Sequence, residues 1–211
     1  MAELRLCFLG DSFVNGTGDP ACLGWAGRLC QAANRRGHVV TYYNLGIRRE
    51  TSTELRQRWR AEVRRRLSSE HDGRLVFSFG VNDMTADGTG TRVALAASLA
   101  NARAILEQAR RAYPLLLVGP PPVADEAQNA RIAGLSERFA QLAAALDVPY
   151  LVVYAALRGS RTWAAEVAAG DGAHPGAGGY AALARLVDRW PAWRAWLGEA
   201  AESLDAGGHR H

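Results

Sequence analysis

Short runs of apolar residues alternate along the chain with longer segments in which apolar residues recur every three or four positions. The short runs have the length of β-strands, and the longer segments have the spacing of helices that bury one face. The runs predict strands at residues 4–9, 39–45, 75–79, 115–118 and 149–153. The segments predict helices over residues 23–37, 51–67, 91–112, 126–146 and 180–190, with a loop around Trp163 before the last helix.

The predicted strands are apolar at successive positions, which is typical of strands covered on both faces of a parallel sheet. Because helices separate them, right-handed crossovers are expected between the strands. We therefore predict an α/β fold of three αβα layers, with a five-stranded parallel sheet in the flavodoxin-like order 2-1-3-4-5. No repeat or linker interrupts the pattern, so residues 1–198 are predicted to form one domain and residues 199–211 a frayed tail.

Composition narrows the possible functions. The chain has 211 residues, a formal net charge of +4 and 25 basic residues, all of which are arginine. The absence of lysine excludes Schiff-base enzymes and nucleotide-binding sites that use a P-loop lysine. Six arginines fall in the predicted helix 51–67, where they alternate with an apolar stripe. We interpret them as a solvated helix face, and we expect no nucleic-acid partner.

The cysteines and the N-terminus bear on the compartment. Cys7, Cys22 and Cys30 form no CxxC pair and would leave one thiol unpaired, which favours a reducing environment. The first apolar run is too short for a signal peptide, and no segment approaches the length of a membrane span. A cytoplasmic protein without a membrane partner is expected, and its oligomeric state is left open.

Polar residues follow the ends of the predicted strands. Ser12, Gly46 and Asn82 follow the first three, and Asp171 and His174 follow the fifth after a long loop. Because parallel strands end at the same edge of a sheet, these residues are expected to converge there.

The converging residue types are those of serine-based acyl transfer, which needs a hydroxyl, a base, a group that orients the base and donors for an oxyanion. We predict Ser12 as the nucleophile, His174 as the base and Asp171, three residues earlier in a glycine-containing turn, as the orienting carboxylate. The N–H groups of Ser12 and Gly46 and the side-chain amide of Asn82 are the predicted oxyanion donors.

Four sequence blocks carry the predicted site residues: Gly10-Asp11-Ser12, Gly46, Gly80-Val81-Asn82-Asp83 and Asp171-Gly172-Ala173-His174-Pro175. In their order these blocks resemble those of the SGNH (GDSL-type) hydrolases. The resemblance implies a flavodoxin-like fold, a Ser-His-Asp triad, a Ser/Gly/Asn oxyanion hole and esterase, lipase or thioesterase activity without a metal or other cofactor. Phe13 departs from the leucine of the name-giving motif, and Val14 excludes the G-x-S-x-G elbow of the α/β-hydrolases.

Other side chains are expected around this site. Asp11 and Asp83 are predicted to brace the loops, whereas Phe13, Met84, Pro121 and Trp163 are predicted to line the pocket. No lid insertion is evident, so a small-molecule ester with a small or short acyl group is the expected substrate.

Alternative functions remain open from the residues alone. A thioesterase, a lysophospholipase or a carbohydrate deacetylase could use the same site. A flavodoxin-like module could hold a phosphate or flavin in the segment from Ser12 to Gly18, although this gives no role to Asn82, Asp171 and His174.

Overall fold

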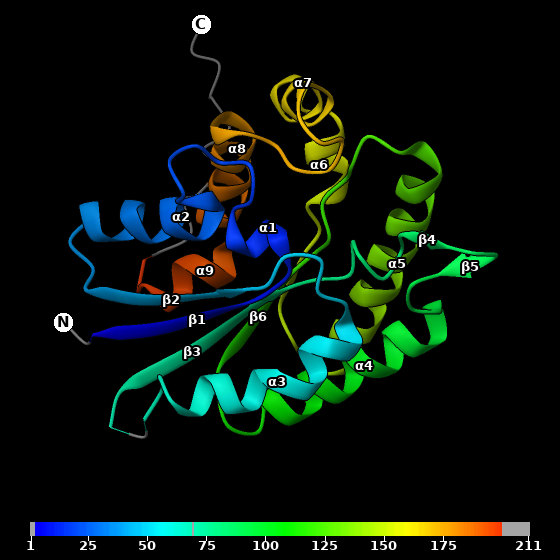
Figure 1. Ribbon diagram of the computed structural model, residues 1–211. Helices are drawn as coiled ribbons and strands as arrows, with labels where there is room; N and C mark the ends of the chain where they lie inside the picture. Colours follow the sequence, from blue (N-terminus) through cyan, green and yellow to red (C-terminus); the bar gives the residue numbers. More distant parts are fainter. Residues whose placement is uncertain (1–2, 69, 200–211) are drawn as a thin grey trace, which may run out of the picture.

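The computed structural model describes residues 3–68 and 70–199. Five strands form a parallel sheet in the order β2-β1-β3-β6-β7 (Figure 1). Counted along the chain within this sheet, the order is 2-1-3-4-5, so the predicted topology is confirmed. The strands are β1 (Leu4–Gly10), β2 (Val40–Gly46), β3 (Asp72–Ser78), β6 (Leu115–Val118) and β7 (Tyr150–Leu151).

Helices cover both faces of the sheet (Figure 1). On one face α2 (Gly24–Arg35) packs against α8 (Ala177–Asp188), which is followed by α9 (Pro191–Trp196). On the other face lie α3 (Ser52–Arg64), α4 (Leu95–Ala109) and α5 (Glu126–Ala145). The three αβα layers expected from the sequence are therefore present.

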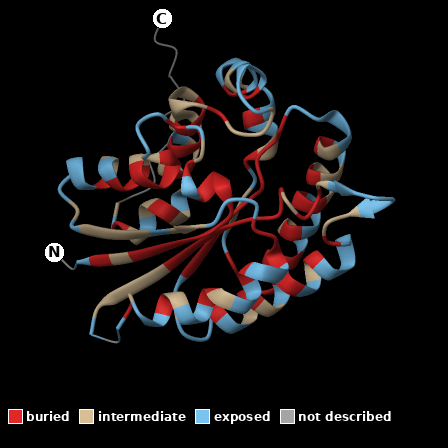
Figure 2. Ribbon diagram, viewed as in Figure 1, coloured by how far each residue is buried: buried red, intermediate tan, exposed pale blue. Residues whose placement is uncertain are grey.

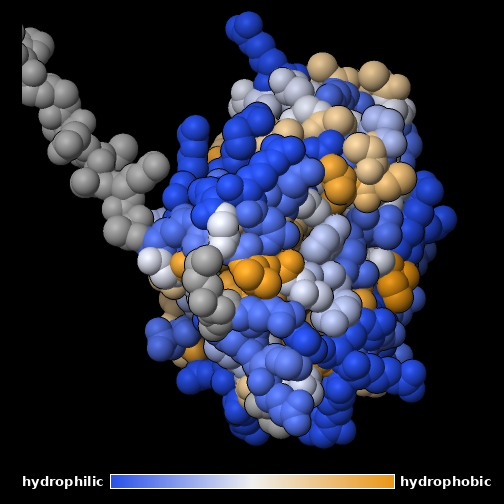
Figure 3. All heavy atoms as spheres, turned by 90° about the vertical axis from the view of Figure 1, so that its left-hand side faces the viewer, coloured by the Kyte–Doolittle hydropathy of each residue, from blue (hydrophilic) through white to orange (hydrophobic). Residues whose placement is uncertain are grey.

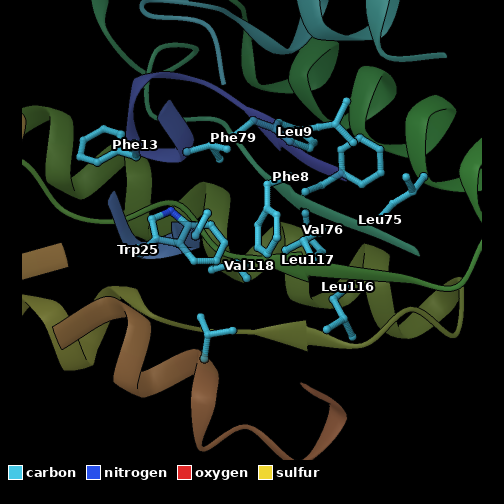
Figure 4. Packing of buried hydrophobic residues seen from close by; sticks show 14 of the residues in the cluster. Phe8, Leu9, Phe13, Trp25, Leu75, Val76, Phe79, Leu116, Leu117 and Val118 are labelled. Carbon is cyan, nitrogen blue, oxygen red and sulfur yellow. The ribbon is translucent and has the colours of Figure 1, made fainter. Parts of the chain in front are cut away.

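The core lies on both sides of the central strands, which are the most deeply buried part of the ribbon (Figure 2). Phe8 of β1 meets Trp25 of α2 edge to face, with ring centroids 5.4 Å apart (Figure 4). On the opposite face Trp59 of α3 meets Phe77 of β3 at 5.8 Å. Edge-to-face aromatic pairs add specific geometry to apolar burial, so each helical layer is held to the sheet by large rings.

Two segments differ from the prediction. The region around Trp163 is helical rather than a loop: it forms α6 (Tyr154–Arg158) and α7 (Arg161–Ala169), and the Ser160 hydroxyl caps α7. Between β3 and α4 the chain makes a small hairpin of β4 (Ala86–Asp87) and β5 (Gly90–Thr91), so the helix predicted from residue 91 begins at Leu95. Gly88, with φ of 56°, makes the hairpin turn.

The C-terminal boundary also differs. Glu199, assigned to the frayed tail, accepts hydrogen bonds from Arg36 Nε at 2.9 Å and Arg194 Nη1 at 2.7 Å. It therefore belongs to the folded part of the chain, and residues 200–211 of the predicted tail lie outside the described residues.

Two features of the described structure concern a possible membrane partner: the hydropathy of its surface and the length of its helices. At the end of the molecule where the strands begin, the surface is mainly hydrophilic and hydrophobic residues form small, separate areas (Figure 3). No helix in the described part of the chain is long and apolar enough to cross a membrane.

Candidate active site

Ser12 is the first residue of α1 (Ser12–Asn15), directly beyond the end of β1. The chain can turn there because Gly10 has no side chain: a Cβ at this position would lie 1.7 Å from the carbonyl oxygen of Ser78. Asp11 caps the short helix and accepts the N–H of Phe13 at 2.9 Å. Sequence and local geometry together fix the serine at the edge of the sheet.

A chain of two hydrogen bonds joins Ser12, His174 and Asp171. The Ser12 Oγ and His174 Nε2 atoms are 2.7 Å apart, and His174 Nδ1 lies 2.7 Å from Asp171 Oδ2. Burial raises the pKa of Asp171, but hydrogen bonds from His174 and Ala173 outweigh it and hold the pKa at about 2. An ionised carboxylate on Nδ1 leaves Nε2 as the acceptor for the serine proton.

The Asp171 carboxylate also shapes the loop that carries the histidine. Its second oxygen, Oδ1, accepts the backbone N–H groups of Ala173 at 3.0 Å and His174 at 2.9 Å. Gly172, with φ of 79°, permits this tight turn. The same side chain therefore orients the imidazole and the backbone that bears it.

Asn82 follows β3 and lines the same cavity as Ser12 and His174. One hydrogen of its amide is donated to the Glu50 carbonyl oxygen at 3.0 Å, and an amide nitrogen carries a second hydrogen. The neighbouring Asp83 is fully buried and accepts the Ser52 N–H at 2.8 Å and the Ser98 hydroxyl at 2.5 Å. Asp83 thus ties this segment to α3 and α4, which leaves Asn82 fixed at the cavity wall.

Gly46 has a different place from the one the sequence suggested. It is not among the residues that line this cavity, and its N–H donates to Asn44 Oδ1 at 3.1 Å. A Cβ at Gly46 would lie 2.2 Å from the backbone nitrogen of Asn15, so glycine is required where β2 passes close to α1. Its role is steric, and the assignment of its N–H to an oxyanion hole is corrected.

Arg49, which the sequence reasoning missed, lies on the cavity in the loop after β2. Its φ is 67°, a left-handed conformation that is uncommon for a residue with a side chain. Its N–H donates to no residue in the described part of the chain. These are features of the folded structure, and nothing in the sequence Ile47-Arg48-Arg49-Glu50 signals them.

Of the four residues predicted to line the pocket, one lines the cavity and three are buried outside it. Phe13 lines the cavity, and its ring centroid is 5.0 Å from that of His174. Trp163 stacks behind Phe13 at 6.3 Å and is itself buried. Met84 and Pro121 are also buried, and none of these last three lines the cavity that contains Ser12.

Asp11 directly precedes Ser12 in the chain and is almost completely buried. Its Oδ2 has no hydrogen-bond partner among the described residues. Burial, together with the negative charges of Asp83 and Glu50, raises its pKa from 3.8 to about 7, against the opposing hydrogen bond from Phe13. This carboxyl group supports the loop and does not contact His174.

The cavity has a volume of about 460 Å³. It brings together residues from the ends of several strands and from α5. The lining residues are Ser12, Phe13, Arg48, Arg49, Val81, Asn82, Thr85, Arg92, Val123, Ala124, Asp125, Gln128, Asp171, Gly172, Ala173 and His174. In the described residues no group of three or more His, Cys, Asp or Glu side chains could hold a metal ion.

The alternative of a phosphate- or flavin-binding loop receives no support from this geometry. The segment from Ser12 folds into helix α1, which Gly16 ends with φ of 85°. The Ser12 hydroxyl is hydrogen bonded to His174 rather than free in a phosphate cradle.

Comparisons with solved structures show the same fold. A lipase/acylhydrolase from Enterococcus faecalis superposes with a TM-score of 0.74 at 22% identity, covering 92% of this chain and 97% of that chain. An acetylxylan esterase from Geobacillus stearothermophilus gives a TM-score of 0.73 at 19% identity, covering 93% and 95%. Variants of that esterase described as catalytic mutants replace a serine, a histidine and an aspartate by alanine.

Sequence comparison supplies the family. A search of curated proteins gives no match. The model of the GDSL-like Lipase/Acylhydrolase family, in contrast, matches residues 8–182, from within β1 to within α8. The match covers the segments that carry Ser12, Asn82, Asp171 and His174, and the chain therefore belongs to the GDSL-like lipase/acylhydrolase family.

Proposed function

We propose that this protein is a serine hydrolase that cleaves carboxylic esters through an acyl-enzyme on Ser12. The observation that carries the proposal is the hydrogen-bonded chain from Ser12 through His174 to Asp171, with both distances at 2.7 Å. Membership of an acylhydrolase family supports ester hydrolysis independently of this geometry.

The reaction follows from the positions of these groups. Ser12 Oγ attacks the ester carbonyl carbon while its proton moves to His174 Nε2, and ionised Asp171 stabilises the resulting imidazolium. The tetrahedral intermediate expels the alcohol, which takes the proton from His174. Water, deprotonated by the same imidazole, then attacks the acyl-enzyme, and the carboxylic acid leaves as Ser12 recovers its proton.

We further propose three donors for the oxyanion: the Ser12 N–H at the start of α1, the free hydrogen of the Asn82 amide and the Arg49 N–H. The support for Arg49 is its place on the cavity and its unpaired N–H among the described residues. Donors held in place before the reaction stabilise the developing charge without reorganisation.

A small acyl group is the expected substrate feature. Polar and charged residues form much of the wall of the cavity, which has a volume of about 460 Å³. A long acyl chain would need an apolar channel, and this lining does not provide one. A structural neighbour that is an acetylxylan esterase adds weight to a short acyl group, although thioesters, lysophospholipids and acetylated carbohydrates stay as alternative substrates of the same site. A cytoplasmic location stays a prediction.

The test is hydrolysis of p-nitrophenyl esters of increasing chain length, together with an acyl-CoA, by the wild type and Ser12→Ala. The wild type is expected to prefer acetate or butyrate, and Ser12→Ala to lose activity by about 10⁶-fold while retaining its melting temperature. A fluorophosphonate should label the wild type only. Equal hydrolysis by Ser12→Ala and the wild type would refute the proposal.

A further inference from the structure

Three arginines line the cavity that contains Ser12. Arg48 and Arg49 belong to the loop after β2, and Arg92 follows the β4–β5 hairpin, so two separate segments bring positive charge to one cavity. The three guanidinium groups stay charged at any physiological pH.

The two carboxylates of the cavity wall, Asp171 and Asp125, already accept hydrogen bonds from groups other than the three arginines. Asp171 accepts three hydrogen bonds from its own loop, and Asp125 accepts the Gln128 N–H at 2.5 Å as the cap of α5. Arg48 Nη2 forms a long ion pair with Asp171 Oδ2 at 3.7 Å, beyond hydrogen-bond distance. The three arginines outnumber the two carboxylates of the cavity wall, so the positive charge of the cavity is only partly balanced by its own lining.

Arg49 is the least engaged of the three. Its guanidinium forms no hydrogen bond or ion pair with any described residue. Its backbone is nevertheless held firmly, since its carbonyl oxygen accepts Arg92 Nη1 at 2.8 Å and the adjacent Glu50 carbonyl accepts the Asn82 amide at 3.0 Å. The fold thus fixes the backbone of this arginine and leaves its charged end open to a ligand.

The left-handed backbone of Arg49 is a second, independent observation. At φ of 67° glycine would be accommodated without strain, whereas a residue with a Cβ is disfavoured. A left-handed backbone at a residue with a long side chain, at the wall of this cavity, points to a functional constraint on that residue.

From these observations we infer that the ester substrate carries an anionic group, a carboxylate or a phosphate, that Arg49 and Arg48 bind beside the scissile bond. Planar guanidinium groups match the oxygen pairs of both anions. Since the acyl group is proposed to be small, the anion belongs to the alcohol part of the ester. This inference rests on the proposed esterase function and names its substrate class.

The probes are three acetyl esters that differ in the charge of the alcohol: 4-acetoxybenzoate, 4-acetoxyphenylphosphonate and the neutral 4-acetoxybenzamide. Their binding to Ser12→Ala is measured by calorimetry, which needs no turnover. One or both anionic esters are expected to bind about five- to tenfold more tightly than the amide at low ionic strength, and which of them binds more tightly distinguishes carboxylate from phosphate recognition. About 0.5 M salt should reduce the preference.

Arginine variants in the Ser12→Ala background assign the effect. Arg48→Gln combined with Arg49→Gln should abolish the preference for the anionic esters. Arg49→Gly, which keeps the backbone N–H and suits the left-handed φ, should remove most of it. Arg60→Gln, on the exposed face of α3, is the matched control and should leave the preference intact.

The outcomes separate the two proposals. Equal binding of the three esters, or a preference that survives the double substitution, would overturn the anionic-substrate inference even if the wild type hydrolyses neutral esters. A preference that disappears in the double variant while the wild type hydrolyses no ester would leave anion binding established and refute the esterase proposal.

Discussion

At the scale of single residues, Asp171 shows how one carboxylate can serve two purposes. Its Oδ2 faces the imidazole of His174, while Oδ1 holds the N–H groups of Ala173 and His174. Replacing it would therefore disturb both the tautomer of the base and the turn that carries it. For this reason substitution of Asp171 is a poor single test of the proposed site, and Asn82, the proposed oxyanion donor, gives a cleaner one.

Asn82→Ala is expected to lower kcat for p-nitrophenyl acetate by about 10²–10³-fold, because the oxyanion loses a fixed donor. The Glu50 carbonyl also loses its 3.0 Å partner, so the melting temperature should be recorded alongside kcat. A variant with wild-type kcat would remove Asn82 from the oxyanion hole.

Asp11 predicts an effect of pH on stability. Its pKa is about 7 in the folded protein and near 3.8 when the chain is unfolded, so between these values the folded state binds the extra proton. The free energy of unfolding should therefore fall as pH rises from about 4 to 7, by a few kcal/mol at most.

Asp11→Asn isolates this contribution, since asparagine can still accept the Phe13 N–H but does not titrate. Denaturant unfolding of both proteins at several pH values should show the variant gaining stability relative to the wild type across that interval. A difference between the two that is independent of pH would mean that Asp11 is not the titrating group.

At the scale of elements, α7 supports the loop that carries His174, the proposed base. Glu166 of α7 accepts the N–H groups of Gly178 at 3.1 Å and Gly179 at 2.7 Å, at the start of α8. Helix α8 begins three residues after His174, so this carboxylate fixes the helix against which the base is positioned. Gly178 allows the approach, since a Cβ there would be 2.6 Å from Glu166 Oε1.

Glu166→Ala should lower the free energy of unfolding by about 1–2 kcal/mol, as expected for loss of a helix cap from another element. It should also lower kcat while changing KM little, because His174 is held less firmly in position. Glu166→Gln, which keeps one acceptor oxygen, is the matched variant and should lose less of both. Unchanged stability and kcat in Glu166→Ala would show that α8 needs no such cap.

Some strands and helices could be predicted from the sequence, and others could not. The strands were predictable because β6 is a continuous apolar run, β1 is one from its third to its sixth residue, and a glycine follows each run. The helices α6 and α7 were not, because each is short, Gly159-Ser160 separates them, and only Leu157, Trp163 and Val167 mark their buried faces. The β4–β5 hairpin has only two residues in each strand, too few for any alternation to be recognised.

At the scale of the whole molecule, the convergence of distant residues follows from the parallel sheet. Ser12 and His174 lie 162 positions apart and meet because their strands or loops end at one edge. The sequence supports that inference through strand order. The sequence could not reveal that Arg49 rather than Gly46 is the proposed oxyanion donor. The close approach of the backbone at Gly46 and the left-handed φ of Arg49 arise only when β2, α1 and the following loop pack together.

Closure of the fold at its C-terminal end depends on Glu199. Its carboxylate joins Arg36 after α2, His38 before β2 and Arg194 in α9, so it connects segments from both ends of the chain. Burial raises the pKa of Glu199, but these hydrogen bonds outweigh it and lower the pKa to about 2. The stabilisation is therefore complete above the unfolded value of 4.5 and disappears as pH falls toward 2.

Glu199→Gln should consequently lower the melting temperature at pH 7 by about 2–4 °C for each kcal/mol lost, and partly exposed ion pairs typically contribute up to about 1 kcal/mol. The gap between variant and wild type should narrow between about pH 4.5 and pH 2, because Glu199 takes up a proton below pH 4.5 in the unfolded chain but only near pH 2 in the folded protein. Glu107→Gln, which removes an exposed i,i+4 partner of Arg103, is the matched control and should have a smaller effect. If the two substitutions proved equivalent at every pH, the contacts of Glu199 would contribute no more than an ordinary surface pair, and the C-terminal end of the domain would be held by the packing of α9 alone.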